Sequence, residues 1–258
     1  MMSPHTLWTA FATIFRREVR RFTRIWPQTL VPPVITMSLY FVIFGSLIGR
    51  RIGEMGGFSY MEFVVPGLIM MAVITNSYSN VASSFYSAKF QRNVEELLVA
   101  PIPNWVIMAG YVLGGVARGL IVGFVVTVIA LLFTALEVQH LALTIAIVFM
   151  AAVLFSLAGF INAIFANSFD DISIIPTFVL TPLTYLGGVF YSIELLSPFW
   201  QGLSKLNPVL YMVNAFRYGV LGVSDINVAW AFVGVLVFIA LLFGWGLHLM
   251  SHGKRLRH

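Results

Sequence analysis

A short polar stretch, Ala88–Pro103, interrupts the long apolar runs of this chain and carries charged side chains suited to binding a protein partner. Its charged residues are Lys89, Arg92, Glu95 and Glu96. If the stretch is helical, the spacing i, i+4, i+7, i+8 places apolar side chains on one face. The polar remainder would face a partner, and two prolines stop the helix, which we predict over residues 88–100. The residues of this candidate contact are Phe90, Gln91, Arg92, Asn93, Val94, Glu95, Glu96, Leu97 and Leu98, with Phe90, Val94, Leu97 and Leu98 on the apolar face.

A second group of polar residues lies inside apolar runs that are long enough to cross a membrane. Arg118 is the one basic residue well inside such a run. A charge in the bilayer costs about 3 kcal/mol or more, so it usually faces protein or water. With Asn76, Asn80 and Asn162 as hydrogen-bond partners it forms a candidate intramembrane polar site. Alternatively, the run around Arg118 starts farther from the membrane, and the arginine reaches the aqueous interface.

The sequence contains none of the common motifs for binding a nucleotide or a metal ion. The only Gly-Lys pair, Gly253-Lys254, is followed by Arg255 and is not part of a P-loop, and neither GxGxxG nor HExxH occurs. The histidines have no ligand spacing, and there are no cysteines. Glu62 and Glu137 lie at the ends of apolar runs, so the spans hold few carboxylates for proton coupling. We therefore expect no catalytic, cofactor or metal site in this chain.

The composition is that of an integral membrane protein. Of the 258 residues, 59% are hydrophobic and 10% are charged, whereas about a quarter are charged in a soluble domain. Solid apolar runs of about 20 residues indicate helical spans, while a barrel would show alternation. We expect an all-α fold with six spans in one transmembrane domain over residues 1–258. The expected spans are residues 26–48, 63–85, 105–133, 141–165, 172–190 and 228–250.

The N-terminal segment, residues 5–24, has the pattern of an amphipathic helix in the membrane interface, although its arginines also fit a plain basic flank of the first span. Its apolar face contains Leu7, Trp8, Phe11, Ile14, Phe15, Val19 and Phe22. With this segment inside, most lysines and arginines lie in the cytoplasm, including those of the C-terminal tail. The outer face receives Arg50, Arg51, Lys205 and Arg217. Both termini and the 88–100 helix are therefore expected in the cytoplasm.

Residues 192–225, before the last span, are apolar and aromatic but interrupted. Two short pieces flank Asn207-Pro208, and neither is long enough to cross comfortably, so we expect a re-entrant or interfacial hairpin on the outer face. A seventh span over residues 206–223 is the alternative, and it conflicts with the distribution of basic residues.

Local signals refine the helix ends and contacts. Asp170 and Asp171 are suited to capping the fifth span, which Pro176 and Pro182 should bend. Prolines at positions 27, 32 and 33 predict an irregular start of the first span. Glycines at positions 110, 114, 115, 119 and 123 permit close helix approach, either within the chain or between subunits.

Several stretches resemble permease subunits of the ATP-binding cassette type-2 exporter family, in particular a bacterial branch of it. They are Val65–Met71 (VPGLIMM), Lys89–Pro103, Phe169–Ser192, Asn207-Pro208 and Phe216–Gly219. The resemblance implies six spans per subunit, a homodimer and an N-terminal connecting helix that matches residues 5–24. It also implies that residues 88–100 form a coupling helix that docks into a separate ATPase subunit, which holds ATP and magnesium, and that residues 192–225 form the outer hairpin.

The function that the resemblance implies is transport of an amphipathic substrate, such as a lipid, a glycan or a drug-like molecule, across a bacterial inner membrane. Two permease chains and two ATPase chains would work together among membrane lipids, and no nucleic acid is involved. Two other classes of function are an ion-coupled permease or channel that works alone and a membrane scaffold that transports nothing. The scarcity of carboxylates in the spans argues against ion coupling.

Overall fold

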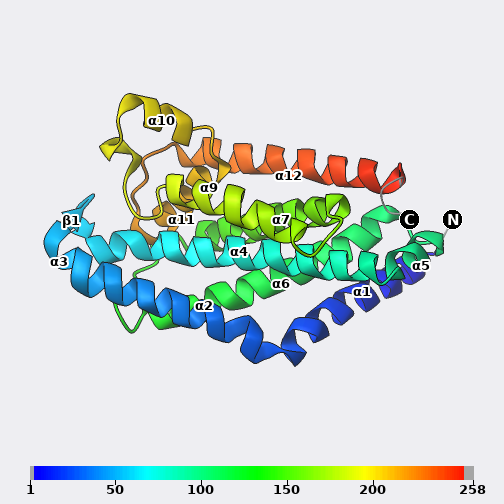
Figure 1. Cartoon of the computed structure of the whole chain (residues 1–258). Helices are drawn as coiled ribbons and strands as arrows, with labels where there is room; N and C mark the ends of the chain where they lie inside the picture. The colour runs from blue at the N-terminus through cyan, green and yellow to red at the C-terminus, as the bar shows by residue number, and fades with distance from the viewer. Residues whose placement is uncertain (1–2, 253–258) are drawn as a thin grey trace.

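The computed structural model describes residues 3–252 and is almost entirely helical, which confirms the all-α fold (Figure 1). In chain order its elements are α1 (Pro4–Arg24), α2 (Trp26–Phe41), the π-helical η1 (Val42–Ile48), α3 (Gly49–Ile52), β1 (Glu54–Met55), β2 (Phe58–Ser59), α4 (Tyr60–Phe90), α5 (Asn93–Val99), α6 (Asn104–Ala130), α7 (Leu141–Phe165), α8 (Asp171–Ile175), the π-helical η2 (Pro176–Leu180), α9 (Thr181–Leu186), the 3-10 helix η3 (Ile193–Leu195), α10 (Pro198–Ser204), α11 (Pro208–Leu221) and α12 (Val228–Ser251). The basic residues expected in the C-terminal tail, Lys254, Arg255 and Arg257, lie outside the described residues.

Five helical segments of the described chain are long and apolar enough to cross a membrane. They are Trp26–Ile52, Tyr60–Phe90, Asn104–Ala130, Leu141–Phe165 and Val228–Ser251. They correspond to the first, second, third, fourth and sixth expected spans. The expected fifth span is instead the shorter apolar helix Asp171–Leu186, which is about 24 Å long at 1.5 Å per residue and falls short of a hydrocarbon core of about 30 Å.

Prolines act differently in the two helices where irregularity is expected. The first span starts as a helix, contrary to the prediction, although Pro32 and Pro33 lie inside it; Pro27 stands in its first turn. A proline in the first turn lacks only an N–H that has no partner there anyway. The π-helical turn of this span lies at its other end. In the expected fifth span, Pro176 begins a π-helical turn, and the Thr181 hydroxyl donates to its carbonyl oxygen at 2.9 Å.

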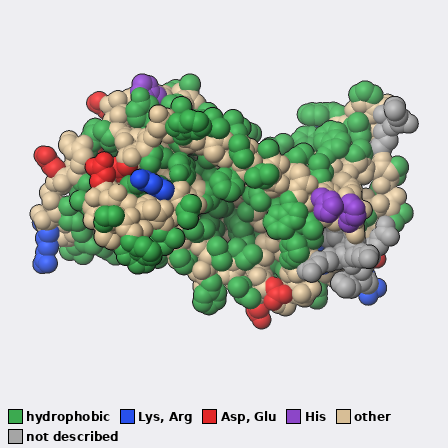
Figure 2. Space-filling view, turned by 90° about the horizontal axis from the view of Figure 1, so that it is seen from above, with side chains coloured by type: hydrophobic (Ala, Val, Ile, Leu, Met, Phe, Trp, Pro, Cys, Tyr) green, Lys and Arg blue, Asp and Glu red, His purple; other side chains and the backbone are tan. Residues whose placement is uncertain are grey.

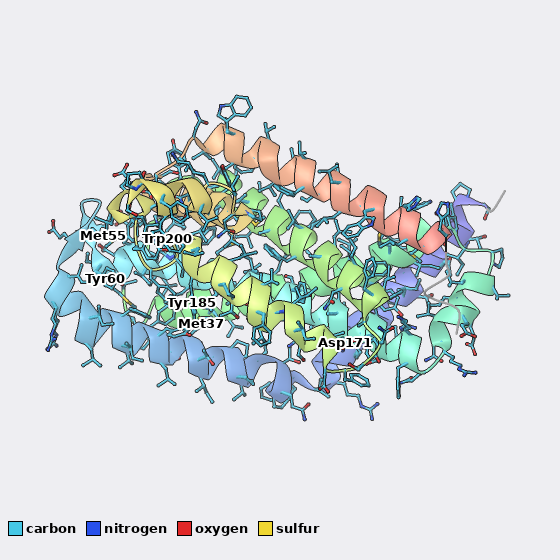
Figure 3. The ribbon with its side chains drawn as sticks, turned by 45° about the horizontal axis from the view of Figure 1, so that its top comes forward. Met37, Met55, Tyr60, Asp171, Tyr185 and Trp200 are labelled. Atoms are coloured by element: carbon cyan, nitrogen blue, oxygen red, sulfur yellow. The ribbon has the colours of Figure 1, made fainter. Side chains whose placement is uncertain are left out.

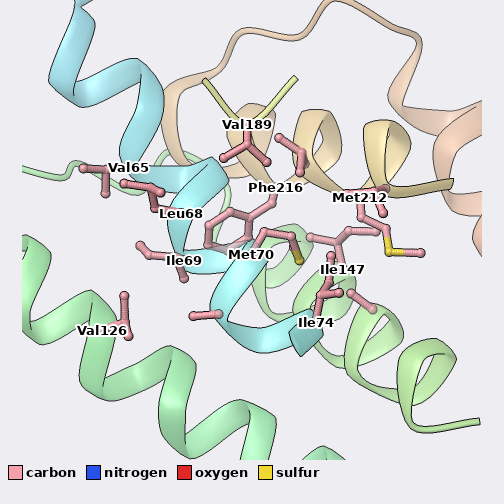
Figure 4. Packing of buried hydrophobic residues seen from close by; sticks show 14 of the residues in the cluster. Val65, Leu68, Ile69, Met70, Ile74, Val126, Ile147, Val189, Met212 and Phe216 are labelled. Atoms are coloured by element: carbon pink, nitrogen blue, oxygen red, sulfur yellow. The ribbon is translucent and has the colours of Figure 1, made fainter. Parts of the chain in front are cut away.

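Helix α4 is the centre of the bundle, and α6, α7 and α11 pack around it (Figure 1). Apolar side chains of these helices interlock around Leu68, Met70 and Ile74 (Figure 4). Of the apolar span window in α4, 83% is buried, against 12% in Trp26–Ile52 and 11% in Val228–Ser251. The first and last spans therefore present most of their apolar side chains outward, and Figure 2 shows such side chains across the middle of one face.

The glycine stripe of α6 packs inside the chain, in agreement with the first of the two interpretations. A Cβ atom on Gly110 would lie 2.6 Å from Ile14 of α1, and one on Gly114 would lie 2.5 Å from Glu18. The next glycines of the stripe face α4 in the same way. The small residues therefore let α6 fit closely between α1 and α4.

Residues 192–225 contain the two short pieces that the sequence predicts. Helix α10, which carries Trp200 (Figure 3), is largely exposed, whereas α11 is mostly buried against α4, α7 and α12. At 14 residues, α11 is too short for the alternative seventh span. Asn207 caps the start of α11, because its side-chain oxygen accepts from the Val209 N–H at 2.9 Å. Its side-chain amide also donates to the Leu183 carbonyl of α9 at 2.6 Å.

A short hairpin joins the first two spans and is the one β element among the described residues. Glu54 pairs with Ser59, and Met55 pairs with Phe58. Gly56 and Gly57 make the turn with φ angles of 62° and 82°, a conformation that glycine adopts without strain.

Candidate functional site

The polar stretch between the second and third spans is two elements and not one helix. Helix α4 continues to Phe90, so it includes the first residues of the predicted 88–100 helix. Arg92 then takes a left-handed conformation with φ of 62°, and α5 begins at Asn93. A helix cannot continue through a left-handed residue. The predicted surface helix is therefore shortened to Asn93–Val99, at the same end of the molecule as the start of α1 and the end of α12 (Figure 1). We call this the α5 end.

Helix α5 is held to the bundle by one apolar side and by a lysine. Val94 is buried, and Leu97 and Leu98 pack against the adjoining core cluster. Lys89 at the end of α4 donates to the carbonyl oxygens of Ile164 and Ala166, at 2.8 Å each. These carbonyls lie at the end of α7, where a cation is favourable. Helix α5 is therefore anchored by its own apolar side, while Lys89 ties the end of α4, which α5 follows, to the end of α7.

The side of the α5 end that points away from the bundle combines apolar and charged groups. Phe90 is 66% exposed and Val99 is 87% exposed, so the predicted grouping of Phe90 with Val94, Leu97 and Leu98 on one face is wrong. Phe90 belongs to α4, and its ring lies 5.4 Å from that of Phe169. A cavity of about 280 Å³ adjoins these residues, and its lining is Tyr86, Lys89, Phe90, Arg92, Glu95, Ala166 and Asn167.

The loop before α8 brings further carboxylates to the α5 end. Asp170 makes no side-chain capping bond to the helix, although the sequence suggests one. The carboxylate of Asp171 instead accepts the backbone N–H groups of Asn167 and Ser168, at 2.8 and 3.2 Å, and the Ser168 hydroxyl at 2.8 Å (Figure 3). The Asn167 N–H contributes most to lowering the pKa of Asp171, followed by the Ser168 hydroxyl. Asp171 therefore closes the loop that precedes its helix.

The structure brings only one of the three asparagines to Arg118. The Arg118 guanidinium lies 3.4 Å from the side-chain oxygen of Asn76. Asn80, one turn farther along α4, accepts a hydrogen bond of 2.7 Å from Arg21 of α1. Asn162 donates to the Ile172 carbonyl at 3.4 Å, away from this group. The predicted polar site therefore contains Arg118, Asn76 and Asn80, together with an arginine from the N-terminal helix.

A buried carboxylate, Glu18, anchors α1 and is not among the predicted site residues. It is 1% exposed and accepts a hydrogen bond from Ser84 of α4. Arg17 and Arg21 lie 3.3 and 3.4 Å from its oxygens. Arg17 also donates to the hydroxyl of Tyr111 of α6. The signal in the sequence is position, because Glu18 lies four residues from both Ile14 and Phe22 on the buried face of α1.

Arg217, which the distribution of basic residues assigned to the outer side of the membrane, has a side chain that is buried inside the bundle. Its side chain is 0% exposed. Its Nε atom donates to the Phe63 carbonyl at 3.3 Å and its Nη2 atom to the Gly188 carbonyl at 2.6 Å. The guanidinium carbon lies 3.8 Å from the centre of the Phe63 ring, a favourable cation–π arrangement. Arg217 thus joins α11, the first turn of α4 and the loop after α9.

Comparison with known proteins agrees with this membrane architecture. A family model described as ABC-2 type transporter matches residues 9–221. The chain is 61% identical over 253 residues to inner membrane transport permease YadH of Escherichia coli K12. These residues cover 98% of this chain and 99% of that protein. It is 22% identical over 220 residues to nodulation protein J of Neorhizobium galegae, with 84% of each chain covered. Nodulation protein J of Rhizobium meliloti is 20% identical over 216 residues, 83% of this chain and 82% of that one. The chain is therefore a membrane transport permease and belongs to the ABC-2 type transporter family.

Proposed function

We propose that this chain is the membrane-spanning subunit of an exporter driven by ATP hydrolysis on a separate chain. Two copies of the permease and two copies of the ATPase form the working assembly, and ATP and magnesium bind to the ATPase. The sequence has no P-loop of its own, so an ATP-driven member of this family needs a partner. The substrate is an amphipathic molecule such as a lipid, a glycan or a drug-like compound.

The feature that supports this proposal most strongly is the fixed yet exposed helix α5. Val94 is buried against the bundle and Lys89 ties the adjoining end of α4 to α7, while Phe90 and Val99 leave large apolar surfaces uncovered. Exposed apolar groups beside charged ones are typical of a protein contact. Because α5 packs on α4, the central helix, a force on α5 reaches the centre of the bundle. A partner that moves when it binds ATP would therefore shift the equilibrium between two arrangements of the spans.

The positions of the first and last helices suggest how the chain crosses the membrane. The start of α1 and the end of α12 lie at the α5 end (Figure 1), which requires an even number of crossings. We propose that Asp171–Leu186, with the loop that follows it, is the sixth crossing. The α5 end then faces the cytoplasm of a bacterial inner membrane, the membrane named for the Escherichia coli relative, and the α10–α11 hairpin faces outward.

Replacement of Glu95 and Glu96 by lysines tests the proposed docking of α5. Glu96 is exposed and Glu95 is partly exposed, so charge reversal should leave insertion and folding intact. We expect the double variant to lose the ATPase when the tagged chain is purified from its native host and the proteins that accompany it are identified by mass spectrometry. Normal recovery of the ATPase with this variant would contradict the proposal.

The matched control reverses two exposed carboxylates at the opposite end of the molecule, Glu54 and Glu194. This variant should retain the ATPase, because only the position of the charges differs. Loss of the ATPase from both variants would indicate a general defect and count against a specific contact at α5. A clean purification of the unmodified chain without any ATPase, also after crosslinking, would favour a permease that works alone.

A further inference from the structure

A cluster of hydrogen-bond donors lies where α1, α4 and α6 meet, close to the bend between α1 and α2. Arg21 of α1 donates to the side-chain and backbone oxygens of Asn80, at 2.7 and 3.0 Å. One turn away on α4, the side-chain oxygen of Asn76 lies 3.4 Å from the guanidinium of Arg118. The contact of Gly114 with Glu18 brings the next turns of α6 and α1 together. We call Arg21, Asn76, Asn80 and Arg118 the elbow cluster.

The elbow cluster has an excess of positive charge. Glu18 is the nearby carboxylate, and it already interacts with Arg17, Arg21 and Ser84. Among residues 3–252, the two arginines of the cluster and the neighbouring Arg17 therefore face one carboxylate, which is an excess of two positive charges. The charge of Arg21 also acts on Arg118, and this repulsion is unfavourable in a partly buried site. The site would gain from a bound negative charge.

The cluster also has donors for which the described part of the chain supplies no acceptor. Asn80 is 0% exposed, and its side-chain amide nitrogen makes no hydrogen bond to the described residues. The Nε atom of Arg118 is buried and is likewise without a partner among residues 3–252. The Nε atom of Arg21 lies 3.4 Å from Glu18 but without hydrogen-bond geometry. A buried donor without an acceptor costs about 1–3 kcal/mol, so the missing component is rich in acceptor oxygens.

The surroundings of the cluster suit a ligand with apolar chains. Ile25 and Trp26 at the bend are 40% and 59% exposed, and Trp is common where the apolar and polar parts of a membrane meet. Beyond the bend, α2 exposes Val31, Ile35 and Leu39 along its outer side. Arg21 remains one-third exposed, so the cluster is reachable from the surface. A phosphate attached to acyl chains matches both the donors and this apolar surface.

We propose that the elbow cluster binds the phosphate of an anionic phospholipid headgroup, with Arg118 and Arg21 as the charged contacts and Asn80 as a neutral donor. The acyl chains of the lipid run along the exposed side of α2. The bound headgroup compensates the two uncompensated arginines and supplies acceptors to the buried donors. This site concerns the permease chain alone and does not depend on the ATPase partner.

The test measures lipid binding to the purified full-length chain by native mass spectrometry in a neutral detergent. Phosphatidylglycerol and phosphatidylcholine with the same acyl chains are titrated separately. We expect tighter binding of phosphatidylglycerol, and we expect Arg118→Gln to weaken it by about tenfold, the loss of one charged hydrogen bond. Arg51→Gln is the matched control, because Arg51 is exposed at the far end of the first span and its change should have no effect.

A second variant tests the charge argument independently. Asn80→Asp keeps the oxygen that accepts from Arg21 and adds a carboxylate inside the cluster, so it should also abolish the preference for phosphatidylglycerol. Equal binding of the two lipids by the unmodified chain would overturn the proposal, as would equal losses in Arg118→Gln and Arg51→Gln. If Asn80→Asp retains the full preference, the cluster is not the binding site.

Inorganic phosphate distinguishes a lipid headgroup from a free anion. It is added to the delipidated chain while the unfolding temperature is followed. A dissociation constant above about 1 mM marks weak binding. If phosphate below about 1 mM does not raise the unfolding temperature, the result supports a lipid whose acyl chains contribute to binding. Saturable stabilisation below that concentration that disappears in Arg118→Gln would show that the ligand is free phosphate and would overturn the lipid assignment.

Discussion

Two arginines inside the bundle, Arg217 and Arg118, have contrasting surroundings. Arg217 is fully buried, bonds to two backbone carbonyls and lies against the Phe63 ring, and the charge of Asp225 acts favourably on it. Arg118 is partly buried, lies at the limit of hydrogen-bond distance from Asn76, and experiences the like charge of Arg21. Both have one buried nitrogen without a partner in the described chain.

The difference separates a structural arginine from one that is suited to a ligand. Burial of a cation is tolerated where the chain supplies acceptors and an opposite charge, and such a group ties segments together. Arg217 meets this condition and joins α11 to the first turn of α4 and the loop after α9. Arg118 does not meet it with protein groups alone. The same residue type therefore has two roles, and the surroundings decide between them.

Arg217→Met should have the largest effect on the stability of the chain. It removes the donors to the Phe63 and Gly188 carbonyls. A hydrogen bond from a charged group contributes about 1.5–3 kcal/mol, so we expect a loss of about 3 kcal/mol or more. The measurement is the unfolding temperature of the purified chain in detergent, together with its yield as a monodisperse species. Arg118→Met serves as the comparison, and it should stay within about 1 kcal/mol because no protein carboxylate is lost. Equal destabilisation by both would remove the distinction between the two arginines.

Glu18→Gln should have the next largest effect. The amide keeps an acceptor for Ser84 but loses the charge that balances Arg17 and Arg21, so we expect a loss of about 2 kcal/mol in the free energy of unfolding. Unfolding in neutral detergent, with and without phosphatidylglycerol, measures it. Because the variant makes the elbow cluster more positive, phosphatidylglycerol should stabilise it more than the unmodified chain. A smaller lipid effect in the variant would count against an anion site.

Gly114→Ala tests how closely α1 must approach α6 to hold Glu18. The added methyl group would lie 2.5 Å from the Cβ atom of Glu18, and such overpacking costs about 1–2 kcal/mol. Gly234→Ala is the control, because a Cβ atom there meets nothing within 4 Å and alanine favours a helix. Chemical unfolding should show a lower free energy of unfolding for Gly114→Ala and a slightly higher one for Gly234→Ala than for the unmodified chain. An unchanged stability of Gly114→Ala would show that α1 is free to shift.

Asp171→Asn should have the smallest effect, because the bonds of this carboxylate are to Asn167 and Ser168 of its own loop. Hydrogen bonds to the carboxylate lower its pKa, so its contribution to stability is present above the ordinary aspartate pKa and is lost as the pH falls through the lowered value. The variant should be slightly less stable at pH 7, and the two proteins should converge below about pH 4. Thermal unfolding across this range measures it. A constant difference at all pH values would contradict the role of the charge.

Most of the long helices, and their approximate positions, could be predicted because they follow from local composition. Apolar runs of span length became α4, α6, α7 and α12, because a helix satisfies its own backbone in any apolar surroundings. The end of α4 could not be located in this way, since Arg92 must adopt a left-handed conformation for α5 to pack with Val94 inward. For the same reason Phe90 belongs to α4, although its spacing grouped it with the apolar face that α5 carries.

Residue types alone establish that this chain is a helical membrane protein with a charged segment between its second and third apolar runs, because hydropathy and charge are properties of each residue. Which polar residues meet depends instead on the packing of the helices. That packing pairs Arg21 with Asn80, places Glu18 between α1 and α4, and encloses Arg217 in the interior. These contacts join segments far apart in the chain, and their distances are set by how closely the helices approach one another.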